Sequence, residues 1–239
     1  FSGKMAGIKS LFKDTAIYGM SSIVGRFLNW CLVPMYTYTF AAAEYGVVTN
    51  LYAYVALVLI ILTYGMETGF FRFANHDRWT DPGQVYTTSL LSLGFTSMVF
   101  IIAACWLSPE IAVWLDCPGH ASYIWMMAIA VGVDAYTSIP FAYLRYKKKP
   151  LRFATLRLLN IAINIGLNLF FILACPAIWR TNPEWIGWFY NPSFGIGYIF
   201  LANLISSLAV LLMVVPEILA ENYNFNFRLL REMLRYSFP

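Results

Sequence analysis

The sequence predicts an all-α, polytopic membrane protein, and three observations carry that prediction. First, 60% of the 239 residues are hydrophobic and 12% are charged, whereas about a quarter of the residues of a soluble domain are charged. Second, the mean hydropathy is +0.63. Third, long runs contain no Lys, Arg, Asp or Glu, namely 45–66, 82–109, 158–179 and 185–216. Each run exceeds the roughly 20 apolar residues that carry a helix across a bilayer.

Six transmembrane helices account for these runs and for two further apolar segments. The segments around Arg26 and Asp134 each contain one charged residue near the middle. Transmembrane strands are excluded, because they alternate in hydrophobicity over about ten residues and these segments are apolar on every side for about twice that length. The predicted helices span about 15–38, 44–71, 86–107, 121–144, 151–177 and 194–216.

Shorter elements lie between and beyond these spans. Pro109 and the apolar spacing of "SPEIAVWLDCPGH" predict a short interfacial helix. The turn "YLRYKKKPLRF" places Pro150 where it can open the fifth helix, and the aromatic-rich "AIWRTNPEWIGWFYNPS" predicts a belt at the membrane surface. In the final segment, Leu and Met alternate with Arg228, Arg231 and Arg235, which indicates an amphipathic helix.

The positions of the cations predict the orientation. Of the 16 Lys and Arg residues, all but Arg26 and Arg180 fall at one end of the predicted bundle. By the positive-inside rule, both ends of the chain are therefore cytoplasmic. The net charge of +4 reflects this topology, and the sequence shows no basic stripe interleaved with aromatics that would indicate a nucleic-acid partner.

The chain accordingly divides into three parts. Residues 1–12 form a cytoplasmic N-terminal segment, in which residues 1–4 precede Met5 and are interpreted as vector-derived. Residues 13–216 form the predicted transmembrane unit. Residues 217–239 form the amphipathic cytoplasmic linker, which turns apolar at its end as though a seventh helix were about to begin.

Three ionisable residues lie within predicted spans, where such groups are costly and usually functional. Arg26 is 13 residues from Lys13, and Asp134 is 11 residues from Arg145, so at about 1.5 Å per residue the two lie at nearly the same depth. They are either a structural ion pair, or Arg26 lines a wet cavity and meets an anionic substrate. In the second case Asp134 is its resting partner or a proton or sodium site. Glu67 is a weaker candidate for the same ion-coupling or ion-pair role, because it can reach the interface as a solvated helix end.

Amide side chains form a second candidate site. Asn160, Asn164 and Asn168 recur every four residues, which places three amides along one face of the fifth helix. They either bind neighbouring helices together or face a sugar or headgroup. Asn29 extends the polar face of Arg26 by one turn and favours a wet lining.

Signatures of enzymes, cofactors and metals are missing from the sequence. Its two histidines, His76 and His120, lie in loops, and no P-loop, G-x-S-x-G or H-E-x-x-H occurs. We therefore expect a protein that is not an enzyme, with no cofactor and no metal site. Cys117 and Cys175 both fall toward the non-cytoplasmic end, where a disulfide is permitted, although membrane cysteines generally behave as small apolar residues.

At the level of motifs the chain resembles a known family. The opening "IKSLFKDTAIYGMSSIVGRFLNWCLVPMYTYTFAAAEYGVVTNLYAY" resembles the first two helices of bacterial polysaccharide and O-antigen flippases, the oligosaccharidyl-lipid exporter branch of the multidrug/oligosaccharidyl-lipid/polysaccharide superfamily. "AYLRYKKKPLRFATLRLLNIAINIGLNLFFI" is similar to the turn between helices 4 and 5 of that family, and "LLREMLRYSFP" to the entry to its seventh helix.

This resemblance implies a fold and an activity. The six helices would be the amino-terminal lobe of a two-lobe transporter in the bacterial inner membrane. It would move undecaprenyl-pyrophosphate-linked oligosaccharide between leaflets by alternating access, for lipopolysaccharide and other surface polysaccharides. Carried to this sequence, Arg26 would meet the pyrophosphate, with Asn29, Asn160, Asn164 and Asn168 as further substrate ligands. This lobe departs from related lipid exporters. They are expected to carry several cavity arginines, whereas this lobe offers only Arg26.

The implied partners are the lipid-linked oligosaccharide, membrane lipids, and a polysaccharide polymerase or glycosyltransferases. Two other functions remain open at this point. One is a cation-coupled multidrug exporter of the same superfamily, which would favour an acidic cavity. The other is a non-transporting scaffold for polysaccharide-assembly enzymes, with the basic turn Lys147–Lys149 as its docking or anionic-lipid surface.

Overall fold

A computed structural model describes residues 2–75, 81–115 and 117–237 of the chain. Within the first helix, it describes only the backbone of residues 2–15, 17, 21, 22, 26 and 29. All regular structure in the described ranges is helical, which confirms the predicted all-α class.

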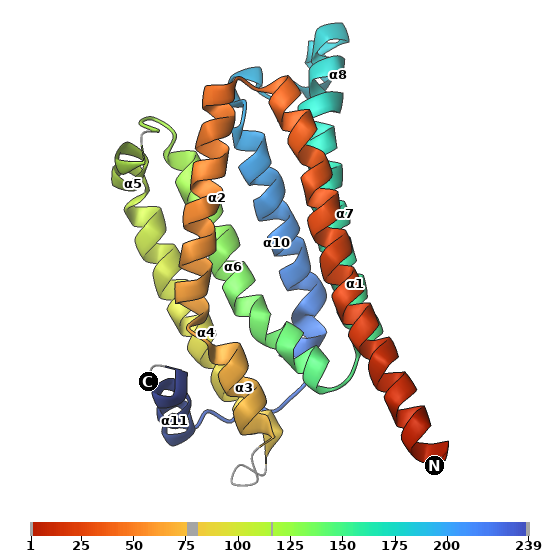
Figure 1. Cartoon of the computed structure of the whole chain (residues 1–239). Coiled ribbons are helices and arrows are strands. Elements are labelled where there is room, and N and C mark those ends of the chain that lie inside the picture. The colour runs from red at the N-terminus through yellow and green to blue at the C-terminus, as the bar shows by residue number, and fades with distance from the viewer. Residues whose placement is uncertain (1, 76–80, 116, 238–239) are drawn as a thin grey trace.

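The helices run back and forth along one bundle (Figure 1). The longer helices are α1 (Ser2–Thr39), α2 (Ala42–Thr63), α4 (Pro82–Trp106), α6 (Ala121–Tyr146), α7 (Pro150–Leu169) and α10 (Gly197–Ile218). The shorter ones are α3 (Met66–Ala74), α5 (Ser108–Trp114), the π-helix η1 (Phe170–Ala174), α8 (Cys175–Thr181), α9 (Pro183–Ile186), the 3-10 helix η2 (Pro192–Phe194) and α11 (Phe227–Ser237).

Five segments are long and apolar enough to cross a membrane: Ala42–Ala74, Pro82–Trp106, Ala121–Tyr146, Pro150–Thr181 and Gly197–Ile218. The chain is therefore a multi-pass membrane protein, as its composition predicts. Each of the five matches one predicted span. The sixth predicted span, 15–38, falls within α1, and its crossing of the membrane stays a prediction.

One predicted helix, 44–71, is divided in the structure. Tyr64 and Gly65 both have left-handed backbone conformations, with φ of 33° and 68°, so α2 ends there and α3 begins at Met66. Glycine adopts this conformation without steric cost, whereas the apolar run around it shows no sign of a break. The helix opened by Pro150 is as predicted, since α7 begins at that residue.

α6 is the central helix of the bundle. Of its most apolar 18-residue window, 72% is buried, against 17% in the α2–α3 segment. Figure 1 shows α6 between α2, α4 and α10, with α1 and α7 side by side at the edge. Polar groups on the faces of α6 that meet α2, α7 and α10 are therefore enclosed by protein.

The start of α1, α3, the α6–α7 turn and α11 lie at the same end of the bundle, called here the basic end (Figure 1). The amphipathic helix α11 buries Leu229 and Met233 in the cluster formed by α3, α4 and α6. The chain that leads to α11 is fastened to α6, because the Tyr143 hydroxyl donates a hydrogen bond to Glu221 and Lys147 Nζ lies 3.2 Å from Glu221 Oε1. The Tyr143 hydrogen bond, with the charge of Lys147 beside it, lowers the pKa of Glu221.

Candidate functional site

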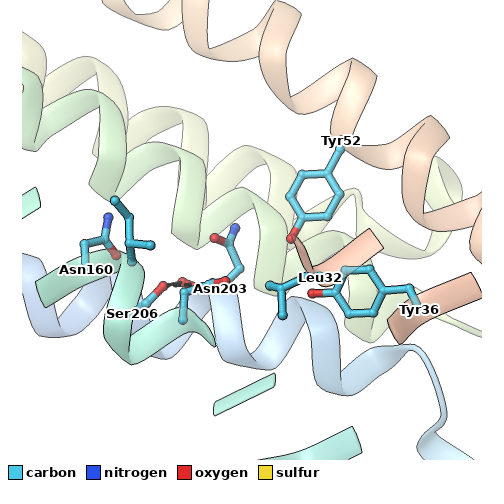
Figure 2. Close-up of a pocket in the computed structure, with 8 residues that line it drawn as sticks. Leu32, Tyr36, Tyr52, Asn160, Asn203 and Ser206 are labelled. Atoms are coloured by element: carbon cyan, nitrogen blue, oxygen red, sulfur yellow. Dashed lines mark hydrogen bonds between the residues drawn. The ribbon is translucent and has the colours of Figure 1, made fainter. Parts of the chain in front are cut away.

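A polar cavity lies between α1, α2, α7 and α10, and we call it the amide pocket. Its volume is about 320 Å³. It is lined by Leu32, Tyr36, Tyr52, Asn160, Ile161, Asn164, Asn203 and Ser206. Figure 2 shows the labelled side chains reaching it from all four helices. None of its lining residues carries a charge, so its chemistry is that of amides and hydroxyls.

The three asparagines of α7 lie along one face of the helix, as their spacing predicts, but they do not play equal parts. Asn160 and Asn164 line the amide pocket, whereas Asn168 is buried beyond it, with 1% of its surface exposed. Tyr36 donates a hydrogen bond to Asn168 Oδ1 at 2.9 Å, and Asn168 Nδ2 donates to the Asn164 carbonyl at 2.8 Å. Asn168 thus joins α7 to α1, which is the bridging role that polar groups take between membrane helices.

The far wall of the amide pocket comes from α10. Asn164 Nδ2 donates to Ser206 Oγ at 3.3 Å, and Asn203 lines the pocket one turn before Ser206. The sequence carried a signal for this wall, because Asn203, Ser206 and Ser207 follow the i, i+3, i+4 spacing within an otherwise apolar helix. Tyr36 and Tyr52 had no such signal, since tyrosines in membrane helices are common near the interface.

The second cavity, which we call the charged pocket, adjoins the first toward the basic end. Its volume is about 330 Å³. It is lined by Leu59, Ile60, Thr63, Glu67, Asp134, Thr137, Ser138, Phe141, Arg157, Asn160 and Val210. Because Asn160 lines both cavities, the two form one polar track along α7.

Opposite charges face each other across the charged pocket. Arg157 of α7 and Asp134 of α6 both line this cavity, where their opposite charges act on each other and Ser207 of α10 lies near the carboxylate. Glu67 forms an ion pair with Arg145. This places α3, α6 and α7 in one network of charges, and Glu67 is an ion-paired group rather than only a solvated helix end.

Comparison with known proteins now bears on the role of these cavities. A family model described as "Polysaccharide biosynthesis protein" matches residues 40–180, more than half of the chain. The chain belongs to this family of polysaccharide biosynthesis proteins. The resemblance drawn from the sequence is thereby confirmed at the level of the family. No curated protein and no solved structure matches the chain.

The match to the polysaccharide biosynthesis family covers most of the polar track. Tyr52, Glu67, Asp134, Arg157 and Asn160 all fall within residues 40–180. The contributions of α1 and α10 lie outside the matched segment. The family therefore associates this chain with polysaccharide biosynthesis.

Arg26 and Asn29 lie outside the described side chains, so their predicted roles stay predictions. The backbone around them is described: Gly25 is buried, and a Cβ added there would approach Ile161 of α7 to 2.6 Å. α1 and α7 are thus in close contact next to Arg26. The predicted pairing of Arg26 with Asp134 is likewise untested.

Arg157 is the functional candidate that sequence reasoning missed. The charge pattern assigned it to the basic turn, together with Lys147–Lys149. It lies seven residues after Pro150, and about two helical turns place its Cα roughly 10 Å further along the bundle. That distance from the proline that opens the helix was the available signal.

Within the residues that the structure describes, no group of three or more His, Cys, Asp or Glu side chains could hold a metal ion. All four cysteines are described, and none is in a disulfide. Cys117 and Cys175, for which a bond was considered, are both buried and not bonded to each other.

Proposed function

We propose that this protein is a flippase that moves lipid-linked oligosaccharide, of the undecaprenyl-pyrophosphate type, across the bacterial inner membrane by alternating access. One observation carries the proposal: a member of a polysaccharide biosynthesis family encloses an uncharged cavity of amides and hydroxyls within an apolar bundle. Amides and hydroxyls both donate and accept hydrogen bonds. They therefore suit the hydroxyl groups of a saccharide that must leave water.

In this proposal the bundle acts as the amino-terminal lobe of a two-lobe transporter, with both ends of the chain in the cytoplasm. The substrate changes leaflet without covalent chemistry. Asn160 and Asn164 bind the saccharide. Arg26 and Asn29 of α1 are further substrate ligands, and Asp134 either releases Arg26 or couples an ion. A polysaccharide polymerase or a glycosyltransferase is the expected neighbour in the membrane.

The test is made in the source bacterium with the gene for the full-length protein deleted. We expect lipid-linked oligosaccharide to accumulate at the cytoplasmic leaflet and surface polysaccharide to fall, with both restored by the wild-type gene. Normal surface polysaccharide in the deletion strain would contradict the proposal. Increased sensitivity to amphiphilic cations without a change in polysaccharide would instead identify a drug exporter.

A scaffold function is tested in the same strain. A scaffold depends on its docking surface, so replacing Lys147, Lys148 and Lys149 by Gln would impair polysaccharide assembly, and changing Arg26 and Asp134 together would not. The flippase proposal expects the reverse order of effects. Membrane levels of each variant, measured by immunoblot, serve as the control for folding.

A further inference from the structure

The charged pocket contains an arginine whose position suits an anionic ligand. Arg157 is exposed to the pocket that it lines, and its Cζ lies 4.5 Å from the centre of the Phe141 ring. A cation over the face of an aromatic ring is held there by the electrostatics of the ring, so Phe141 positions the guanidinium without accepting a conventional hydrogen bond from its five N–H donors. These donors match two oxygens of a phosphate, and this geometry is why arginine is favoured for such groups.

The other charges of the pocket determine what Arg157 faces when no ligand is bound. Glu67 is held by Arg145. Asp134 and Arg157 are the other charged residues that line the pocket, and their opposite charges act on each other there. Among the described side chains, Ser207 of α10 and Tyr52 of α2 also lie near Asp134. One carboxylate and one guanidinium therefore balance each other inside the bundle, where an uncompensated charge is costly.

An anion that binds Arg157 disturbs this balance. It takes the N–H donors of the guanidinium and brings its own negative charge close to Asp134. A carboxylate left without its counter-ion in a medium of low dielectric is strongly destabilised and becomes neutral by taking a proton. Binding of the anion and protonation of Asp134 therefore favour each other.

The neighbouring cavity indicates what the anion is attached to. Asn160 is shared by the charged pocket and the amide pocket, so a ligand lying along α7 has one charged and one uncharged environment. A phosphate or diphosphate at Arg157, followed by a saccharide beside Asn160 and Asn164, uses both. The order along the bundle is then anion toward the basic end and saccharide toward the other end.

We propose that Arg157 binds the diphosphate group of the substrate and that Asp134 is the counter-ion which this group displaces, with uptake of a proton from water. This inference rests on the proposed function for the identity of the substrate. No covalent bond changes, and the proton is released again when the diphosphate leaves and Asp134 returns to Arg157. Arg157, which the charge pattern assigned to the turn, becomes an anion-binding residue of this lobe.

The experiment uses purified full-length protein in nanodiscs and the probe farnesyl diphosphate, with farnesol as the uncharged comparison. Titration calorimetry in buffers of different ionisation enthalpy gives both the affinity and the number of protons taken up. For the wild type we expect diphosphate binding to exceed farnesol binding, with uptake of up to about one proton.

Three variants separate the roles of the two charges. Arg157→Gln should weaken diphosphate binding at least about tenfold, because it removes a bidentate charged donor. Arg152→Gln is the matched control, since Arg152 lies on the same helix but pairs with Glu217 outside the pocket, and it should bind as the wild type does. Asp134→Asn should bind the diphosphate several-fold more tightly, without proton uptake.

Equal binding by the Arg157→Gln and Arg152→Gln variants would overturn the assignment of Arg157. Weaker binding by Asp134→Asn, or unchanged proton uptake in it, would overturn the counter-ion role. If Arg157→Gln fails to fold, as judged by size-exclusion chromatography, Asp134→Asn still decides, because tighter binding without proton uptake requires a displaced counter-ion.

The outcome is distinguishable from failure of the proposed function. If diphosphate binding depends on Arg157 but deletion of the gene leaves surface polysaccharide unchanged, the flippase proposal fails and the assignment of Arg157 stands. If deletion abolishes surface polysaccharide but Arg157→Gln restores it fully, the assignment of Arg157 fails and the flippase proposal stands.

Discussion

The amide pocket and the charged pocket have almost equal volumes, about 320 and 330 Å³, and they share Asn160, yet they differ in chemistry. The first presents amides and hydroxyls, and the second presents two carboxylates and a guanidinium. An uncharged pocket binds a ligand through hydrogen bonds, each of which contributes a modest net free energy. A charged pocket binds through groups that are costly to separate, so its occupancy is coupled to the ionisation of its lining. The two pockets therefore differ in the residues that line them at each depth along α7, and not in size.

The largest effect should follow from changing the residue that the two pockets share. Asn160→Leu keeps a similar side-chain volume but removes the amide from both cavities, so we expect export of surface polysaccharide to fall at least about tenfold, equivalent to about 1.4 kcal/mol. Export is measured as surface polysaccharide in the complemented deletion strain. Asn50→Leu is the matched control, because Asn50 is an exposed amide on α2 that lines neither pocket. Equal export by both variants would remove the distinction between the pockets and the rest of the bundle.

Within the amide pocket, Tyr36→Phe tests whether the buried end of the amide line is structural. The change removes the hydrogen bond to Asn168 and should lower the free energy of unfolding by about 0.6 kcal/mol, and by no more than about 1.7 kcal/mol. The measurement is unfolding of the purified protein in detergent. Tyr38→Phe, at a residue that is 92% exposed, should leave stability unchanged. A loss equal to that of the control would mean that this hydrogen bond adds no stability.

At the edge of the charged pocket, Glu67→Gln removes one charge of the ion pair with Arg145. The Arg145 side chain is 33% exposed and the Glu67 side chain 40% exposed. The pair is therefore partly screened by solvent, and its loss should cost about 0.2–1 kcal/mol. The loss should shrink as salt is added, because salt screens exposed charges. Unfolding at low and high salt measures this, with exposed Glu110→Gln as the control. A cost independent of salt would indicate that the pair is shielded from solvent.

The smallest effect at neutral pH should come from Glu221, which lies outside both pockets and contributes through its pKa. Because the folded protein lowers the pKa of Glu221, the charged carboxylate stabilises the fold above its ordinary pKa of 4.5. That contribution is lost as the pH falls through the lowered value. Stability of the wild type should therefore decline more steeply in acid than that of Glu221→Gln. Tyr143→Phe removes the hydrogen-bond donor and should flatten the same part of the profile; parallel profiles for all three proteins would refute this account.

Much of the fold could be predicted because its causes are local in the sequence. Charge-free runs locate the spans, Pro150 marks the start of α7, and the Leu and Arg alternation of the last segment predicts α11. The break at Tyr64 and Gly65 could not be predicted in the same way. It lies within a continuous apolar run, and the packing of α3 beyond it, against α4, α6 and α11, involves segments distant in the sequence.

The candidate site was predictable only in part, because it also depends on packing between segments that are distant in the sequence. The spacing of Asn160, Asn164 and Asn168 places them on one helical face, but whether each amide lines a cavity or bridges to Tyr36 depends on where α1 and α10 lie. Depth along a helix, estimated from flanking charges, paired Asp134 with Arg26. It overlooked Arg157, because a cation near a basic turn was counted as part of that turn.

The sequence by itself determined the all-α class, the membrane environment and the residue types available to a ligand, because hydrophobicity and helical periodicity depend on residues close together along the chain. Tertiary structure alone decided which of those residues meet. It brought Asp134 of α6 and Arg157 of α7 to the lining of one cavity, and it placed Asn160 where it lines two cavities. Such contacts depend on how the helices rotate and slide against one another, and that packing is set by all the helices together.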